Sequence, residues 1–208
     1  MDENNRVQWV YNAPDREELE KRYDAWAGDY DHDLNESFGY IGPRLGAEYF
    51  ARHVPLKAHV LDAGAGTGLV GVELAALGYK RIDGIDMSQG MLDIARAKGV
   101  YGELRQMVLG ERLAYPDDHF DAVVSVGVLT LGHAPASSLD ELVRIVKSGG
   151  YVVFSLRPDI YEQKGFKEKQ SELESSGLWK LVEVSQEVKI MPKGEPEVSH
   201  QVWVYQVA

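Results

Sequence analysis

The sequence predicts an α/β fold: a doubly wound, seven-stranded and mostly parallel sheet that ends in an antiparallel hairpin and carries an N-terminal helical cap. Three observations support this prediction. Between residues 58 and 157, short apolar runs alternate with segments of helical period, as in successive βα units. A glycine-rich turn at 64–68 joins the first apolar run to the first of these helices. Two long alternating runs follow at 179–190 and 198–207, separated by two prolines and a glycine, which is typical of a hairpin.

The composition is that of an ordinary globular domain. The chain has 208 residues, of which 44% are hydrophobic and 26% charged, so it can bury a core without disulfides or metal ions. It contains no cysteine, which excludes thiolate metal sites and cysteine nucleophiles. We expect a single domain made of a helical cap over residues 1–55, a ligand-binding core over 56–157, and a helix with the C-terminal hairpin over 158–208.

The cap is expected to contain two helices. Asn12 can cap the first helix by accepting a hydrogen bond from one of its free amides. Four large side chains share one face of this helix at spacings of four, three and four residues: Leu19, Tyr23, Trp26 and Tyr30. The second helix is expected from Pro43 to His53. A shared apolar face predicts that the first helix packs against the rest of the protein.

The first half of the core predicts two βα units. The apolar run His59–Asp62 is expected to form the first strand, and the apolar segment Leu69–Leu77 the helix after it. Arg81–Asp86 is expected to be the second strand. Ser88 can cap the following helix, which has apolar residues on one face. Each strand is therefore followed by a helix, as a parallel sheet requires.

The second half of the core predicts two further strands and a helix. The third strand lies within Gly102–Leu109, and the fourth, 120–126, is apolar enough to be buried on both faces. A helix is expected from Ser138 to Lys147, because Ser138 and Glu141 can each satisfy the other's free amide in a capping box.

The pattern changes towards the end of the chain. Gly149-Gly150 is expected to break the preceding helix before a fifth strand at 151–156. One charged helix is expected from about Tyr161 to Ser176. The alternating runs 179–190 and 198–207 then pair as the antiparallel hairpin.

The strongest functional signal is the segment Asp62-Ala63-Gly64-Ala65-Gly66-Thr67-Gly68 between a predicted strand and a predicted helix. Glycines there let the backbone approach a ligand, and the free amides of a helix N-terminus donate to polar or anionic groups. Asp86 stands eighteen residues beyond Gly68, at the end of the second strand, where a carboxylate can hold a ribose diol. The glycines alone would equally suit a tight turn, but the loop and the acid together predict a nucleoside cofactor.

On these residues the sequence resembles the class I methyltransferases that use S-adenosylmethionine (SAM), over about residues 20–157. Their first motif pairs an acidic residue with Gly-x-Gly-x-Gly, as this segment does. The resemblance implies a Rossmann-like fold, SAM as the cofactor and S-adenosylhomocysteine (SAH) as its product. It also implies that the loop lies under the methionine part, that Asp86 holds the ribose, and that Met87 lines the adenine side. The implied cofactor-binding residues are Tyr30, Asp62, Gly64, Ala65, Gly66, Gly68, Asp86, Met87, Met91, Leu109, Gly110, Val126 and Gly127.

One motif departs from this family, and four others narrow the resemblance. Many members carry an aspartate after the third strand to hold the adenine amino group, and this chain has Leu109-Gly110-Glu111 there. The segments 26–31, 68–71, 86–92 and 126–129 are similar to the group of methyltransferase-like proteins that includes one encoded in the Williams-Beuren syndrome region. This closer resemblance supports the cofactor and identifies no methyl acceptor.

Two other interpretations remain open at this level. Gly66–Gly71 also satisfies the Gly-x-Gly-x-x-Gly pattern of NAD-binding proteins, and Asp86 lies twenty residues after Gly66. Asp62-Ala63-Gly64 would lengthen the turn before that pattern, and the chain has a hairpin where a dehydrogenase usually adds a catalytic domain. Both features favour a SAM-binding protein over an NAD-binding oxidoreductase. A SAM-binding module that senses or scaffolds without turnover fits the same cofactor residues.

The candidate catalytic residue is His133. Methyl transfer from a sulfonium ion is an in-line displacement, so alignment and exclusion of water supply much of the acceleration. An amine, hydroxyl or thiol acceptor must also lose a proton, and a histidine suits that role near neutral pH. His133 follows the fourth strand, at the edge where such sheets bind ligands, although an ordinary loop histidine would fit the same position. The candidate acceptor-pocket residues are Trp26, Tyr40, Leu131 and Arg157.

The charge and the N-terminus limit the partners. A formal net charge of −11 would repel a nucleic-acid backbone unless Lys and Arg gathered on one face. We therefore expect a small-molecule acceptor with a nitrogen, oxygen or sulfur atom, no nucleic acid and no membrane. The first residues show no signal peptide, so a cytoplasmic monomer or homodimer is expected. No metal is expected, because Glu36 and Gly42 replace the essential glycine and glutamate of the calcium-loop-like segment that begins at Asp31.

Overall fold

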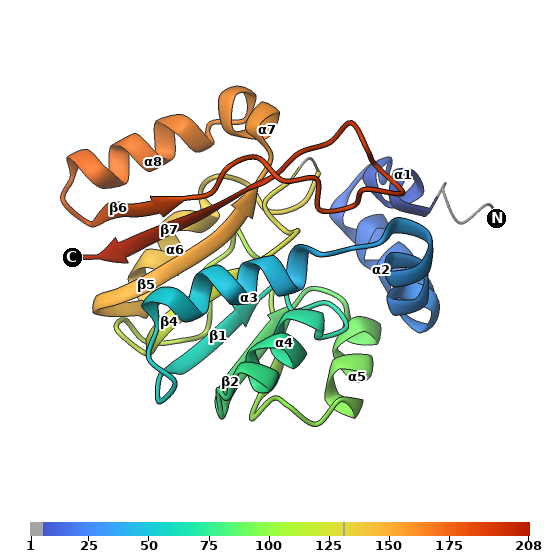
Figure 1. The fold of residues 1–208 in the computed structure, drawn as a ribbon, viewed down its shortest axis with the longest axis horizontal. Coiled ribbons are helices and arrows are strands. Elements are labelled where there is room, and N and C mark those ends of the chain that lie inside the picture. The colour runs from blue at the N-terminus through green and yellow to red at the C-terminus, as the bar shows by residue number, and fades with distance from the viewer. Residues whose placement is uncertain (1–5, 131) are drawn as a thin grey trace.

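The computed structural model describes residues 6–130 and 132–208. Its centre is a seven-stranded sheet in the order β3-β2-β1-β4-β5-β7-β6 (Figure 1). β1 to β5 run parallel, and β7 is antiparallel to both of its neighbours, β5 and β6. This arrangement confirms the predicted α/β fold class. The strands are β1 (His59–Ala63), β2 (Arg81–Asp86), β3 (Leu104–Gln106), β4 (Phe120–Ser125), β5 (Val146–Leu156), β6 (Trp179–Val184) and β7 (Gln201–Val207).

Helices cover both faces of this sheet. α3 and α4 lie in front of it in Figure 1, and α6 lies behind. α5 contacts β2 and β3 near one edge, and α8 contacts β6 near the other. The helices of this part of the chain are α3 (Gly42–His53), α4 (Leu69–Leu77), α5 (Gln89–Ala97), α6 (Ser138–Ile145), α7 (Pro158–Gln163) and α8 (Phe166–Ser175).

The strands supply side chains to two hydrophobic cores, one on each face of the sheet. On β5, Val152 and Phe154 pack with residues of α6 and α8, whereas Val153 packs with residues of α3 and α4. On β4, Val123 joins the first core and Val124 the second. Burial on both faces explains why consecutive residues of these strands, such as Val123-Val124 and Val152-Val153-Phe154, are apolar instead of alternating with polar residues.

The N-terminal cap lies at the end of the sheet towards which the parallel strands point (Figure 1). It consists of α1 (Arg6–Tyr11), α2 (Arg16–His32) and a π-helical segment at Asp33–Phe38. A third hydrophobic cluster joins this cap to Ile190 and Met191 of the segment between β6 and β7. Parts of the chain far apart in sequence therefore enclose the space beyond the carboxyl ends of the strands.

The predicted helix cap at Asn12 is wrong, and Asp15 takes this role. The Asp15 side chain accepts a hydrogen bond from the Glu18 N–H at 2.9 Å. The Asn12 N–H instead donates to the Gln8 carbonyl at 3.0 Å, so it continues the hydrogen bonding of α1. A short additional helix before α2 thus moves the capping position by three residues.

The predicted capping box at Ser138 and Glu141 is also wrong. α6 begins without a side-chain hydrogen bond at its N-cap residue. Glu141 instead accepts a hydrogen bond from the Leu113 N–H at 2.8 Å. Gly149-Gly150 does not break the helix, because α6 has already ended at Ile145 and both glycines lie within β5.

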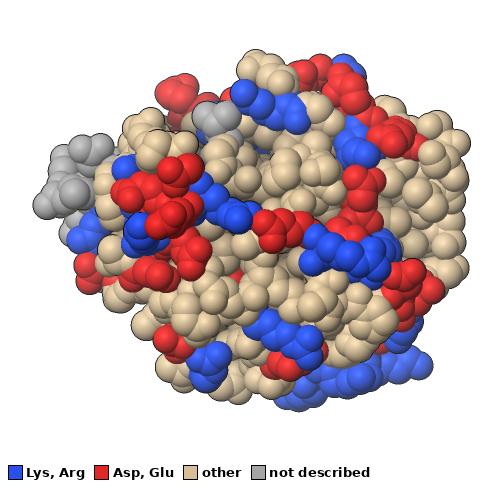
Figure 2. Space-filling model, turned by 180° about the vertical axis from the view of Figure 1, so that it is seen from behind, with Lys and Arg blue, Asp and Glu red and all other residues tan. Residues whose placement is uncertain are grey.

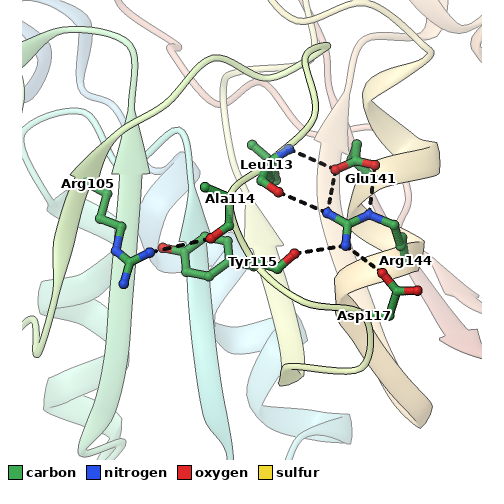
Figure 3. Close-up of polar contacts among 7 residues, drawn as sticks. All are labelled: Arg105, Leu113, Ala114, Tyr115, Asp117, Glu141 and Arg144. Atoms are coloured by element: carbon green, nitrogen blue, oxygen red, sulfur yellow. Dashed lines mark hydrogen bonds and ion pairs between the residues drawn. The ribbon is translucent and has the colours of Figure 1, made fainter.

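Arg144 of α6 holds the segment between β3 and β4 in place (Figure 3). Its guanidinium donates to the carbonyl of Leu113 at 3.1 Å, to the carbonyl of Tyr115 at 2.9 Å and to the Asp117 carboxylate at 2.7 Å. It also pairs with Glu141 at 2.6 Å, and these acidic partners raise the pKa of Arg144 above its usual value. The segment that leads from β3 towards Leu113 is therefore anchored at its far end.

The C-terminal region differs from its prediction in two details. The expected single helix is divided into α7 and α8, because Gly165 has φ +78° and interrupts the helical backbone. The hairpin strands are shorter than the alternating runs, and Val188 and His200 form an isolated bridge beyond them. The residues between the strands leave the sheet to pack against the cap.

Candidate functional site

The glycine loop between β1 and α4 is held against the end of β2. The Gly64 and Ala65 N–H groups donate to the Ile85 carbonyl at 2.8 and 2.9 Å, and the Gly66 N–H donates to Asp86 Oδ2 at 2.8 Å. The loop and the predicted ribose acid are therefore in direct contact at the carboxyl ends of two adjacent strands.

The three glycines of the loop serve different purposes. A Cβ on Gly64 would come 2.3 Å from a methyl carbon of Val128, and one on Gly68 would come 2.9 Å from the ring of Tyr101, so packing alone demands glycine at both. A Cβ on Gly66 would meet nothing within 4 Å. Because Gly66 lies on the wall of a cavity, the space beside it is open to a bound group.

This cavity has a volume of about 300 Å³ and lies between the strand ends and the N-terminal cap. Its wall contains all the predicted cofactor-binding residues except Asp62 and Gly68, and it also contains His133 and Tyr40. The predicted residues on the wall are Tyr30, Tyr40, Gly64, Ala65, Gly66, Asp86, Met87, Met91, Leu109, Gly110, Val126, Gly127 and His133.

Asp86 is fixed in position by backbone donors. Its Oδ1 accepts from the Ser88 N–H at 2.9 Å, while its Oδ2 accepts from the Gly66 N–H. Burial raises the pKa of Asp86 above its ordinary value, and these backbone hydrogen bonds oppose that rise. A carboxylate with two oxygens, each already oriented by one amide, retains lone pairs that can accept hydrogen bonds from a diol.

Asp62 lies behind the loop instead of on the cavity wall. Its Oδ2 accepts a hydrogen bond from the Tyr101 hydroxyl at 2.7 Å, and its Oδ1 is buried with no hydrogen-bond partner among the described residues. Burial raises the pKa of Asp62 to about 7, and the nearby charge of Asp86 acts in the same direction. Asp62 therefore lies behind the loop as a buried acid that is held by Tyr101.

The cap is attached to the rim of the cavity by carboxylates of α2. Asp24 Oδ1 accepts from the Gly90 N–H at 2.9 Å and from the Ser88 hydroxyl at 2.6 Å, beside the N-terminus of α5. Ser88 caps α5 as predicted, by accepting from the Met91 N–H. Asp31 accepts from the Thr67 hydroxyl and pairs with Lys98. These contacts hold α2 across the cavity.

His133 contacts a residue of the cap. Its Nε2 lies 2.7 Å from the hydroxyl of Tyr23, and its ring is also in edge contact with Tyr11, with 5.4 Å between ring centroids. Tyr23 is enclosed, and burial raises its pKa well above the ordinary value. Tyr23 therefore stays protonated, so it can donate to a neutral imidazole.

A second, smaller space of about 40 Å³ adjoins the large cavity, and we call it the inner compartment. Tyr23, Tyr30, Tyr40 and Gly127 line both spaces. Of the predicted acceptor-pocket residues, Trp26 lines the inner compartment and not the large cavity. Its Nε1 donates to Asp33 at 2.7 Å. The four shared residues form the boundary between the two spaces.

Of the other two predicted acceptor-pocket residues, only Arg157 is among the described residues. Leu131 lies outside the described residues. Arg157 pairs with Asp159 at 2.7 Å and lines neither space.

Sequence reasoning did not assign several wall residues to the site. Tyr23 was recognised only as part of the apolar face of α2, and its spacing carried no sign of a partner on the β4 loop. Tyr101, which lies behind the glycine loop and not on the wall, has no local sequence signal, since its contact with Asp62 depends on how α5 leads into β3. The remaining unassigned residues of the large cavity include Arg16, Leu19, Thr67, Leu69, Met107, Val108, Glu111, Val128 and Pro135.

The outer surface carries mixed charge. Figure 2 shows Lys and Arg interspersed with Asp and Glu over much of the face opposite to that in Figure 1. Several exposed charged residues of the protein form ion pairs, such as Arg96 with Asp93 and Lys147 with Asp121. Within residues 6–130 and 132–208, no group of three or more potential ligands could hold a metal ion. No helix in the same part of the chain is long and apolar enough to span a membrane.

The chain is similar in sequence to known methyltransferases. Residues 61–154 match the family model described as a methyltransferase domain. The chain is 36% identical over 181 residues to Methyltransferase-like protein 27 of Homo sapiens, which covers 84% of this chain and 73% of that protein. It is 33% identical over 129 residues to a ubiquinone biosynthesis O-methyltransferase of Alkalilimnicola ehrlichii, covering 60% of this chain and 49% of that protein.

Solved structures share the fold. The cyclase SpnF superimposes with a TM-score of 0.71 at 18% identity, covering 94% of this chain and 97% of that one. A SAM-dependent methyltransferase of Thermotoga maritima, described as a possible histamine N-methyltransferase, gives 0.62 at 21% identity, covering 88% and 97%. At these identities the similarity shows the fold alone. Together with the human relative, the glycine loop and the acid that ends β2, it establishes that the chain belongs to the class I SAM-dependent methyltransferases.

Proposed function

We propose that this protein transfers a methyl group from SAM to a small molecule with a nucleophilic nitrogen, oxygen or sulfur atom. The observation that carries the proposal is the carboxylate of Asp86 on the wall of a 300 Å³ cavity, beside the open space at Gly66. In this proposal Asp86 accepts hydrogen bonds from the ribose, the glycine loop lies against the methionine part, and Met87 lines the adenine side. The mixed surface charge and the net charge of −11 support a small-molecule acceptor over a nucleic acid.

When bound, SAM supplies an electrophilic methyl group on a positively charged sulfur. The residues of the chain would align the acceptor and keep water out, since Tyr30 and Tyr40 close the cavity from the cap side. Tyr23 and His133 can remove the proton of the acceptor: the Tyr23 oxygen takes it while the Tyr23 proton passes to His133 Nε2 across their 2.7 Å contact. The imidazole of His133 would then carry the proton and its positive charge.

Calorimetric titration with SAH tests the cofactor assignment. We expect the wild-type protein to bind SAH and D86A to bind it at least about tenfold more weakly, because the ribose loses its acceptor. D93A is the matched control, since Asp93 is an exposed acid on α5 that pairs with Arg96 away from the cavity. Binding of NADH without binding of SAM or SAH would establish the dinucleotide interpretation instead.

A panel of amines, phenols, thiols and carboxylates, assayed for SAH release, tests the reaction. The relative named for O-methylation in ubiquinone biosynthesis supports a small-molecule acceptor. The second candidate function is a SAM-binding module without methyl transfer, and the cyclase of the same fold supports keeping it. Tight SAM binding with no SAH release from any acceptor class would favour that module.

A further inference from the structure

The inner compartment adjoins the proposed cofactor cavity on the side of the cap. Tyr23, Tyr30, Tyr40 and Gly127 line both spaces, so a molecule that occupied both would pass between these residues. The compartment has about 40 Å³, compared with about 300 Å³ for the large cavity. A water molecule needs roughly 10–15 Å³ of such space, so the compartment accommodates only one end of a larger ligand.

The wall of the compartment is apolar and aromatic, with a few uncharged polar groups. Among the described residues, no Asp, Glu, Lys or Arg contributes to it. Trp26 donates its one N–H to Asp33, so this group is already used. A charged ligand group would therefore lose its hydration here without meeting an opposite charge on the wall, which is costly.

His200 lines this space and has an unused polar atom. The residue comes from the start of the returning chain before β7, is only 5% exposed, and has its Nδ1 buried with no hydrogen-bond partner among the described residues. Burial lowers the pKa of His200 to about 4, and Arg157 acts in the same direction. The imidazole is therefore neutral at physiological pH, and its Nδ1 donates or accepts according to the tautomer.

Thr130 supplies a second polar atom on the same wall. Its hydroxyl is buried and has no hydrogen bond of ordinary geometry among the described residues, although it lies near enough to the Tyr11 hydroxyl to lower the pKa of that phenol. Burial has the larger effect and raises the pKa of Tyr11 to about 12, so the phenol is neutral. Buried polar atoms without partners are rare in folded proteins and require an explanation.

The nearest charges stay outside the compartment. Arg157 is paired with Asp159, and the two have opposite effects on the pKa of His200. Burial raises the pKa of Glu195, whose Oε1 accepts a long hydrogen bond of 3.4 Å from Gln8. These groups are not among the wall residues, so they do not supply a counter-charge to a ligand inside.

We infer that the inner compartment binds the uncharged, hydroxyl-bearing end of the methyl acceptor, with His200 and Thr130 as its hydrogen-bond partners. A hydroxyl is the group that fits, because its single oxygen both donates and accepts, whereas an ammonium only donates and a carboxylate only accepts. The aromatic side chains at the boundary suit a ring or an alkyl chain behind that hydroxyl. That the ligand is the methyl acceptor rests on the proposed function. The preference for a hydroxyl group rests only on the residues that line the compartment.

Four compounds of matched shape test the assignment: benzyl alcohol, benzylamine, benzoate and toluene. Their dissociation constants are measured by ligand-observed NMR titration of the full chain saturated with SAH. We expect benzyl alcohol to bind at least about tenfold more tightly than the other three. Binding of benzylamine or benzoate removes water from a charged group, which weakens binding. Toluene leaves the polar atoms of His200 and Thr130 without a hydrogen bond.

Two variants assign the preference to this wall. T130V removes a hydroxyl at nearly constant volume, and H200F removes the imidazole nitrogens and keeps a planar ring. Each is expected to weaken benzyl alcohol by about threefold to tenfold, the effect of one lost hydrogen bond, and to leave toluene and SAH unchanged. H119F is the control, because His119 stacks on Tyr115 away from both spaces.

Three results would overturn the assignment: benzylamine or benzoate binding as tightly as benzyl alcohol, unchanged benzyl alcohol binding in both variants, or no probe binding to a chain that binds SAH. T130V provides the answer by itself if H200F does not fold. A chain that binds no SAH contradicts the proposed function instead. The same titrations on the unliganded chain then show whether the hydroxyl preference exists without it.

Discussion

The Tyr23 hydroxyl lies 2.7 Å from His133 Nε2, between a helix of the N-terminal cap and the loop after β4. Both residues line the large cavity, and Tyr23 also lines the inner compartment. The contact therefore lies where the proposed cofactor cavity and the proposed acceptor compartment meet. It gives the candidate base a neighbour that transmits a proton, and it makes the cap part of the site.

Replacing His133 with alanine is expected to lower kcat by about 100-fold with any acceptor that releases SAH, within the usual range for a general base. Y23F should lose about as much, because the Tyr23 hydroxyl passes the proton to His133. Both variants should keep their SAH affinity, because neither residue is assigned to the cofactor. The loss should shrink as pH rises towards the acceptor's own pKa. H119A serves as a histidine control, and an unchanged kcat in H133A would remove the proposed role.

Alanine at two positions of the glycine loop is expected to affect different properties: fold stability at Gly64 and SAH binding at Gly66. G64A should destabilise the fold by about 2 kcal/mol or more, because its Cβ would come 2.3 Å from Val128. G66A should cost about 1 kcal/mol, from its positive φ of +54°, and should weaken SAH binding by more than tenfold. Thermal unfolding and calorimetry measure the two effects. Unaltered SAH affinity in G66A would show that the open space at Gly66 is not occupied by the cofactor.

The stability of the protein is expected to depend on pH through Asp62. Its pKa is raised from 3.8 to about 7 by burial, so the folded state holds this proton more tightly than the unfolded state. The resulting stabilisation is complete below about pH 4 and is lost as pH rises through about 7. Because D62N has no such proton, the free energy of unfolding of the wild type relative to D62N should fall by a few kcal/mol over that range.

Urea unfolding at pH 4, 6 and 8 measures this difference. D93N is the comparison, because the pKa of the exposed Asp93 is lowered by its hydrogen bonds to Gln89 and Arg96. The pH dependence of this contribution is opposite to that of Asp62: the stabilisation by Asp93 is present above its ordinary pKa and is lost as pH falls. Parallel pH profiles for the wild type and D62N would contradict the assignment of Asp62 as a buried acid.

Methionine in place of Arg144 is expected to loosen the segment between β3 and β4. The variant loses the hydrogen bonds to the carbonyls of Leu113 and Tyr115 (Figure 3) and should be destabilised by about 2 kcal/mol. SAH should also bind several-fold more weakly, since Leu109 and Gly110 precede this anchor and line the cavity.

The control for this change is R105M. Arg105 reaches the same segment through a 3.5 Å hydrogen bond to the Ala114 carbonyl and through the ring of Tyr115, and these exposed contacts are worth less. If R144M and R105M had equal effects on SAH binding, the anchoring role of Arg144 would be contradicted.

Much of the fold could be predicted because its signals are local. The apolar runs of β1, β4 and β5 are long and buried on both faces, and Ser88 caps α5 as its position indicated. The errors arose where a neighbouring element intervened. The short helix α1 includes the hydrogen bond of Asn12, so α2 is capped by Asp15 instead. Glu141 forms hydrogen bonds with Arg144 and Leu113, so it does not form a capping box with Ser138.

By itself, the sequence determined the order of the elements, the glycine loop and Asp86 at the end of β2, since period, glycine content and strand ends are written in consecutive residues. Only the tertiary structure decided that Tyr23 meets His133, that Asp62 turns away from the cavity towards Tyr101, and that His200 closes an inner compartment. These contacts join residues tens of positions apart. Their distances depend on how the cap and the hairpin segment pack over the sheet, which no local pattern encodes.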